Sequence, residues 1–161
     1  MWWIVAVVTV VVLVATYVTW IAGRVDRLHA RAAAAHAALD AHLVRRAASA
    51  AELADLLGSA ELRAIARAAL DADLEDRELA ENDLTRELRR LPPVDDTPGV
   101  DGMVAISRRV ALTRQVHNDS VRDALSVRRR RLVRLLRLTR RHPAPRYFDV
   151  DDPMLDPGVT V

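Results

Sequence analysis

Few side chains in this chain have the types and spacing of a metal site. His29 and His36 are seven residues apart, which would put them on one face of a helix, and His36 with Asp40 forms an i, i+4 pair that could supply half of a metal site. A metal ion needs three or four converging ligands, and no second cluster accompanies this pair. We therefore predict no bound metal or cofactor and interpret these histidines as surface or seam residues.

A second candidate is the acidic stretch from Asp71 to Asp76, whose carboxylates are spaced similarly to those of a calcium loop. Such a loop needs a glycine at its sixth position and a carboxylate at its twelfth. This stretch has no glycine at the sixth position, and Asn82 stands at the twelfth. The sequence therefore excludes a calcium loop.

The motifs of the common enzyme classes are also missing. The chain has no cysteine, which excludes a disulfide, a thiolate metal site and a cysteine nucleophile. It contains no phosphate-binding glycine loop, no HExxH motif and no nucleophile elbow. We predict a protein that is not an enzyme and that takes no small-molecule substrate.

The residue type with the clearest pattern is arginine. Eight arginines fall between Arg128 and Arg141, a density that suggests nucleic acid, an anionic membrane or an acidic protein partner. At helical spacing this run is amphipathic. One face carries Arg130, Arg134, Arg137 and Arg141, and the opposite face carries Leu132, Leu135 and Leu136. A solvated face is the favoured interpretation, and docking of an acidic partner is the next. Nucleic acid is the least favoured, because no aromatic residue accompanies the arginines to stack on bases.

The elements that must position these residues begin with an apolar run, Met1–Ala22, which contains no charged side chain. Roughly 20 apolar residues in a helix span a bilayer. Aromatic residues lie toward both ends of the run, namely Trp2, Trp3, Tyr17 and Trp20. The alternative, a cleaved signal peptide, is less favoured because the start is not basic and the run is too long. Since Arg24, Arg27 and Arg31 follow at once, we predict a transmembrane anchor with its N-terminus outside and the rest in the cytoplasm.

The remaining chain predicts an all-α fold. Apolar spacing predicts one helix from Arg24 to Leu57 that ends at Gly58, and it leaves open whether this helix is continuous with the anchor. It predicts a second helix that is capped by Ser59 and stops at Pro92. A third helix is expected from about Met103 to about Arg141. The domains are then an anchor (1–22), an antiparallel bundle of three long helices, or four if one is broken (23–141), and a mobile tail rich in Pro and Asp (142–161). Three helices of this length put the arginine-rich end roughly 50 Å from the membrane, too far for attraction to its lipids.

Within the third helix, His117 and Asn118 form a polar pair in the apolar seam. Two interpretations remain open for this pair. It forms an interhelical hydrogen-bond network that sets the register of the helices, or His117 is a half-exposed histidine with no such role.

Several stretches resemble the LemA family of bacterial membrane proteins, whose members have an N-terminal span followed by a cytoplasmic helical bundle. LDAHLVRRA resembles a family segment at Leu39, Asp40, Leu43, Arg45 and Arg46. AENDLTRELRRL resembles a family helix, and PRYFDVDD resembles the family's closing motif. A further pattern is matched at Arg114, Asn118 and Val121, where His117 stands in place of the family's tyrosine.

The resemblance implies a membrane-anchored helical scaffold or docking protein in the bacterial cell membrane, without catalysis. Self-association is a further expectation, because Ala-rich helices can leave an apolar stripe uncovered. The alternative function is a membrane-tethered nucleic-acid-binding protein that uses the arginines of the third helix.

Overall fold

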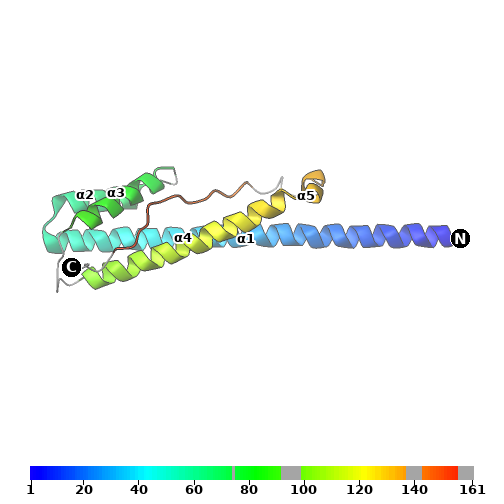
Figure 1. The fold of residues 1–161 in the computed structure, drawn as a ribbon, viewed down its shortest axis with the longest axis horizontal. Helices are drawn as coiled ribbons and strands as arrows, with labels where there is room; N and C mark the ends of the chain where they lie inside the picture. The colour runs from blue at the N-terminus through cyan, green and yellow to red at the C-terminus, as the bar shows by residue number, and fades with distance from the viewer. Residues whose placement is uncertain (74, 92–98, 137–142, 156–161) are drawn as a thin grey trace. The chain divides into compact units, whose positions relative to one another are not determined.

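The computed structural model describes residues 1–73, 75–91, 99–136 and 143–155, apart from the side chain of Leu132, and it contains no strand within these ranges (Figure 1). The helices are α1 (Trp2–Leu57), α2 (Ala60–Asp71), α3 (Arg77–Arg90), α4 (Val100–Arg128) and α5 (Arg131–Leu135). The predicted all-α class is therefore confirmed.

The contacts divide the chain into two units. Unit 1 comprises Met1–Ala34 and Asp119–Arg146, and unit 2 comprises Ala35–Asn118 and Tyr147–Val161. Helices α1 and α4 each contribute residues to both units. The division does not follow the boundary expected after residue 22, which α1 crosses without a break.

Helix α1 confirms that the apolar segment, Met1–Ala22, continues into the next helix (Figure 1). Its three threonines donate their hydroxyl hydrogens to carbonyls four residues earlier at 2.8–2.9 Å, so the segment exposes no unsatisfied hydroxyl. This end of α1 is long and apolar enough to cross a membrane. The helix ends as expected, because Gly58 adopts the left-handed conformation at φ 66°. The Ser59 hydroxyl then accepts the Leu62 N–H at 3.2 Å and caps α2.

The predicted second helix is broken between α2 and α3. Asp73 causes the turn, because its carboxylate accepts the backbone N–H groups of Glu75 and Asp76 at 3.0 and 3.1 Å. Short acidic side chains compete with the helical backbone in this way. The expectation of one continuous helix was wrong, and the bundle follows the alternative in which one helix is broken. The pair α2–α3 reverses the chain once more than three helices would (Figure 1).

The extra reversal changes the direction of α4. In unit 2, Arg46 of α1 contacts Ser107 of α4, and ten residues earlier on α1 the ring of His36 lies 5.4 Å from that of His117. Numbers fall along α1 as they rise along α4, so the two helices are antiparallel. Helix α4 therefore returns along α1 toward the apolar segment instead of leaving it.

The predicted third helix also ends earlier than expected, at Arg128. The Arg130 N–H donates to the Val127 carbonyl three residues back at 3.1 Å, a tight turn that closes α4 before α5 begins. Arg128 repels Arg131 at i, i+3 spacing and Arg130 repels Arg134 at i, i+4, and both repulsions weaken a continuing helix. Arg130 consequently lies outside the helix that carries Arg134. Leu135 and Leu136 are 78% and 40% exposed instead of packed, which corrects the predicted apolar face.

Each unit has its own apolar core. In unit 2, alanine and leucine residues of α1, α2 and α3 pack with Met103 of α4 in one cluster. Leu39, Leu43 and Val110 form another with Phe148 and Val150 from the C-terminal segment. In unit 1, a smaller cluster joins residues of α1 with residues of α4 and α5. Its members are Ile21, Val25, Leu28, Val127 and Val133.

Candidate functional site

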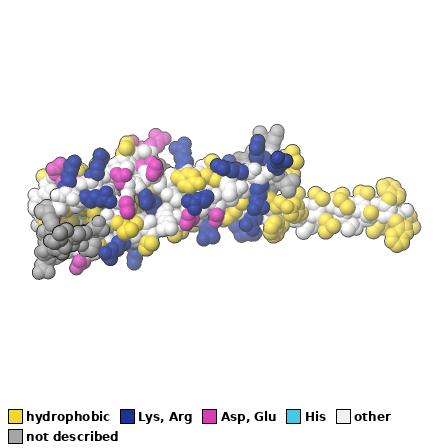
Figure 2. All heavy atoms as spheres, in the orientation of Figure 1, with side chains coloured by type: hydrophobic (Ala, Val, Ile, Leu, Met, Phe, Trp, Pro, Cys, Tyr) yellow, Lys and Arg dark blue, Asp and Glu magenta, His cyan; other side chains and the backbone are white. Residues whose placement is uncertain are grey.

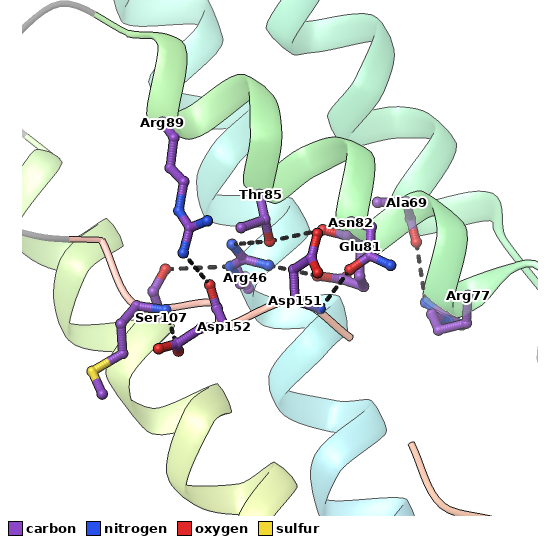
Figure 3. A network of polar contacts seen from close by, with 11 residues as sticks. Arg46, Ala69, Arg77, Glu81, Asn82, Thr85, Arg89, Ser107, Asp151 and Asp152 are labelled. Atoms are coloured by element: carbon purple, nitrogen blue, oxygen red, sulfur yellow. Dashed lines mark hydrogen bonds and ion pairs between the residues drawn. The ribbon is translucent and has the colours of Figure 1, made fainter. Parts of the chain in front are cut away.

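A buried polar network ties three helices of unit 2 together (Figure 3). The guanidinium of Arg46, on α1, donates to the Glu81 carboxylate at 2.8 Å and to the Thr85 hydroxyl at 2.9 Å, both on α3. It also donates to the Ser107 hydroxyl on α4 at 3.3 Å. All four residues are fully buried. Because all four side chains are buried and bonded across α1, α3 and α4, this arrangement positions the helices.

Burial dominates the electrostatics of this pair. It raises the pKa of the Glu81 carboxyl, and the nearby charge of Arg46 opposes that rise. Burial also lowers the pKa of Arg46, again opposed by its partner. Among the described residues, the Glu81 Oε1 atom has no hydrogen-bond partner. Each charge therefore offsets the desolvation cost of the other, since either charge alone would be expensive to bury.

The C-terminal segment is fastened to unit 2 by hydrogen bonds between side chains and backbone. Asn118 makes two of them with Phe148, accepting its N–H at 3.0 Å and donating to its carbonyl at 3.1 Å. Further bonds follow along the segment from residues of α3 and α4: Glu78 accepts from Asp149 N, Arg114 donates to Val150 O, Asn82 accepts from Asp151 N, and Arg89 donates to Asp152 O. Figure 3 shows the last two of these bonds. The sequence analysis treats 142–161 as one mobile tail, whereas residues 147–155 are packed on the bundle, with Phe148 and Val150 buried.

The residues considered as metal ligands have other contacts. Asp40 lies 3.5 Å from Arg77, which uses the same guanidinium to donate to the Ala69 carbonyl. His36 and His117 lie side by side as rings, and His117 is buried. Within the described ranges, no group of three or more His, Asp or Glu side chains could hold a metal ion.

One further histidine, His42, lies close to two arginines. Its pKa is lowered, first by burial and then by the charges of Arg45 and Arg109. The neutral imidazole is therefore favoured in the folded protein.

Arg130 and Arg131 do not lie at the distant tip of the bundle, where the predicted three-helix order would put them. In unit 1, Arg24, Arg130 and Arg131 line a hollow of about 290 Å³, whose other walls are Tyr17, Trp20, Ile21, Val127 and Val133. The hollow adjoins the C-terminal end of the apolar segment. The predicted position roughly 50 Å away is wrong, because it rested on an unbroken second helix.

A partly buried contact supports this arrangement in unit 1. Arg128 donates to Nε2 of His29 at 3.2 Å, and Nδ1 of the same ring lies 2.9 Å from the Val25 carbonyl. Because arginine only donates and a carbonyl only accepts, the neutral tautomer with its hydrogen on Nδ1 satisfies both contacts. The end of α4 is thereby joined to α1 about two turns beyond the apolar segment.

Of the predicted partner-binding residues, Arg130 and Arg134 are exposed in unit 1, while Arg137 and Arg141 lie outside the described residues. The positions that carry the family resemblance are mostly structural. Leu39, Leu43 and Val121 are buried, Arg45 is exposed, and Arg46, Arg114 and Asn118 make the bonds described above. Sequence patterns did not identify Glu81, Thr85 and Ser107 as the buried partners of Arg46. The available signal was Glu81 and Thr85 at i, i+4 on a leucine-bearing helix face.

No protein-family model, curated protein or solved structure matches this chain.

Proposed function

We propose that this chain is a single-pass membrane protein whose anchor continues into a helical scaffold that docks other proteins, without catalysis. One observation carries the proposal: a single helix, α1, is bare and apolar at one end and supplies the core of unit 2 at the other. Trp2 is 91% exposed and Leu13 is 63% exposed, and Figure 2 shows this end as apolar side chains without acidic or basic ones.

The energetic reason is the cost of leaving this surface in water. Apolar surface gains about 25 cal/mol for each Å² removed from water, so an uncovered segment of this length favours insertion into lipid. Arg24, Arg27 and Arg31 are all exposed directly after it. The positive-inside rule supports an N-terminus outside and both the end of unit 1 and all of unit 2 in the cytoplasm.

The resemblance to the LemA family supports the same architecture. Residues from its separate motifs meet in unit 2, where Arg46 binds Glu81, Asn82 accepts from Asp151, and Asn118 binds Phe148. Motifs that are far apart in the sequence thus make one set of contacts. We accordingly propose a divergent LemA-type protein of a bacterial cell membrane.

The docking surface proposed for an acidic partner, or for a second copy of the chain, is the exposed arginines of unit 1. Photo-crosslinking in intact membranes tests it. A photoreactive amino acid at Arg134 should give a defined adduct, and the same group at Leu79, an exposed position in unit 2, is the control. Equal adducts at both positions, or none at Arg134, would contradict docking at the arginines.

The membrane anchor has its own test. The full chain should remain in the membrane pellet after alkaline carbonate extraction. Because the chain has no cysteine, Leu79→Cys introduces a single thiol. An impermeant maleimide should label it only after the cells are opened. Labelling in intact cells would show that the predicted orientation is wrong. Recovery of a shortened chain from the medium would contradict the membrane anchor.

The second candidate function is tethering of nucleic acid through the same arginines, of which Arg129, Arg130, Arg131 and Arg134 are exposed. Retention of the detergent-solubilised chain on a nucleic-acid resin at two salt concentrations separates the candidates. Binding to phosphates should weaken steeply as salt rises. Absence of retention at low salt would remove this alternative.

A further inference from the structure

The hollow in unit 1 combines two kinds of wall. One wall is aromatic and aliphatic, with Tyr17 and Trp20 stacked at 6.3 Å between ring centroids. The other is cationic, formed by Arg24 of α1 and by Arg130 and Arg131 from the end of the chain's helical part. All three arginines are exposed, so their charges are available to a ligand.

The position of the hollow specifies the ligand's chemistry. It adjoins the end of the segment proposed to cross the membrane, at the level where tryptophan and tyrosine favour the lipid headgroups. Guanidinium groups bind phosphate oxygens in pairs. Basic clusters just cytoplasmic of a span attract anionic lipids. A polar phosphate and an apolar chain joined in one molecule would satisfy both walls.

Two further features of unit 1 fit a lipid surface better than water. Leu135, 78% exposed, and Leu136 follow the arginines directly on and beyond α5. The partly buried contact between His29 and Arg128 joins the arginine-rich end to α1 near this level. The basic side chains gather beside the base of the bare apolar helix in Figure 2.

We propose that this hollow binds the headgroup of an anionic phospholipid of the cytoplasmic leaflet. Arg24, Arg130 and Arg131 hold the phosphate, while Trp20 and Ile21 contact the lipid where its acyl chains begin. A volume of about 290 Å³ accommodates a headgroup, so the acyl chains lie along the outside of α1. The inference rests on the proposed function, because it requires the apolar segment to lie in a bilayer.

Quenching of Trp20 fluorescence by brominated lipids tests the proposal. The variant Trp2→Phe/Trp3→Phe leaves Trp20 as the single tryptophan of the full chain. It is reconstituted in vesicles of phosphatidylcholine containing a minor fraction of phosphatidylglycerol, with bromine on the acyl chains of one lipid or the other. Brominated phosphatidylglycerol should quench Trp20 more than its mole fraction predicts, and high salt should reduce this preference.

Arginine variants then locate the preference. Each arginine near an anionic surface contributes roughly a fivefold preference. Arg130→Gln/Arg131→Gln should therefore remove most of the preference, and Arg24→Gln, an exposed site on an uninterrupted helix, should lower it several-fold. The matched control, Arg67→Gln/Arg108→Gln, removes two exposed arginines of unit 2 and should retain the preference. If the control variant lost the preference for phosphatidylglycerol while the variants at the hollow retained it, the assignment of the lipid site to the hollow would be wrong.

The outcomes distinguish the two proposals. Equal quenching by both brominated lipids places Trp20 in the bilayer and overturns only the lipid site. Quenching by neither lipid contradicts the membrane anchor itself. If soluble glycerophosphoglycerol at constant ionic strength abolishes the preference, the site recognises a free phosphate ester and not a lipid. If a short RNA abolishes it, nucleic acid is the ligand.

Discussion

Removing either partner of the buried pair Arg46–Glu81 should destabilise unit 2, but with opposite dependence on pH. In Glu81→Gln the guanidinium stays buried and charged, because arginine does not lose its proton in proteins. Breaking a buried ion pair from one side costs about 3–5 kcal/mol. The raised pKa of Glu81 makes the wild type lose stability as pH rises above 4.5, a dependence that the variant lacks, so we expect the loss to be smaller at pH 7 than at pH 5.

Arg46→Met should behave differently because a carboxyl can become neutral. Without Arg46, burial raises the pKa of Glu81 further, since the opposing charge is gone. The folded state then favours a protonated carboxyl, whereas the unfolded chain ionises it above its ordinary pKa of 4.5. Keeping the carboxyl protonated costs up to about 1.4 kcal/mol for each pH unit above that value, so the penalty should be larger at pH 7 than at pH 5. Stability of this variant should fall as pH rises through that window.

The assay is urea unfolding of the full chain in a non-denaturing detergent, followed by helical circular dichroism at both pH values. Differences from the wild type cancel the titration of every other group. Arg45→Met is the matched control, because this neighbouring arginine is exposed, and it should change the free energy of unfolding by less than about 0.5 kcal/mol. Arg46→Met/Glu81→Leu should be closer to wild type than either single variant, because no buried charge remains. If both single variants lost less than about 1 kcal/mol, or if the loss in Glu81→Gln grew with pH as it does in Arg46→Met, the reasoning would be refuted.

Three further predictions concern the end of α1 at Gly58, the C-terminal segment and His42. Gly58→Ala should lower the free energy of unfolding by about 1–2 kcal/mol, because only the left-handed backbone strains the new side chain; an unchanged urea midpoint would contradict this. Asn118→Ala removes both bonds to Phe148 and should speed hydrogen exchange of the Phe148 amide, while the amides of α2 keep their protection; slow exchange at Phe148 would show that packing alone holds the segment. His42 has a lowered pKa, so wild-type stability should decrease as pH falls below 6.5, and His42→Gln should lose part of that decrease; identical pH profiles by urea unfolding would exclude the contribution.

The positions of turns show how far local patterns reach. Gly58 and Ser59 were identified correctly because each acts through its own backbone or one hydrogen bond, and neither depends on a distant partner. The turn at Asp73 uses equally local chemistry, but it contains neither glycine nor proline. A cluster of acidic residues permits both a helix and a turn. Packing of α2 against α3 favours the turn.

The network around Arg46 could be predicted only in part. The pair of arginines at Arg45 and Arg46 was noted in the sequence, yet Arg46 is buried and Arg45 is exposed. Helical spacing separates their directions by about 100°, but it does not say which of them meets a carboxylate. The answer depends on Glu81 and Ser107, which come from helices far away in the sequence.

What the sequence alone determined is the helical fold, the long apolar N-terminal helix, and the cap and termination beyond it, because backbone propensity and apolar spacing act within a few residues. Only the tertiary structure decided where the arginines lie. One turn at Asp73 adds a reversal, and a reversal changes the end to which every later helix runs. Arg130 and Arg131, from the arginine run that was assigned to the distant tip, thereby come to line a hollow with Trp20. Direction along a bundle depends on how many times the chain turns back, and that number follows from packing between helices.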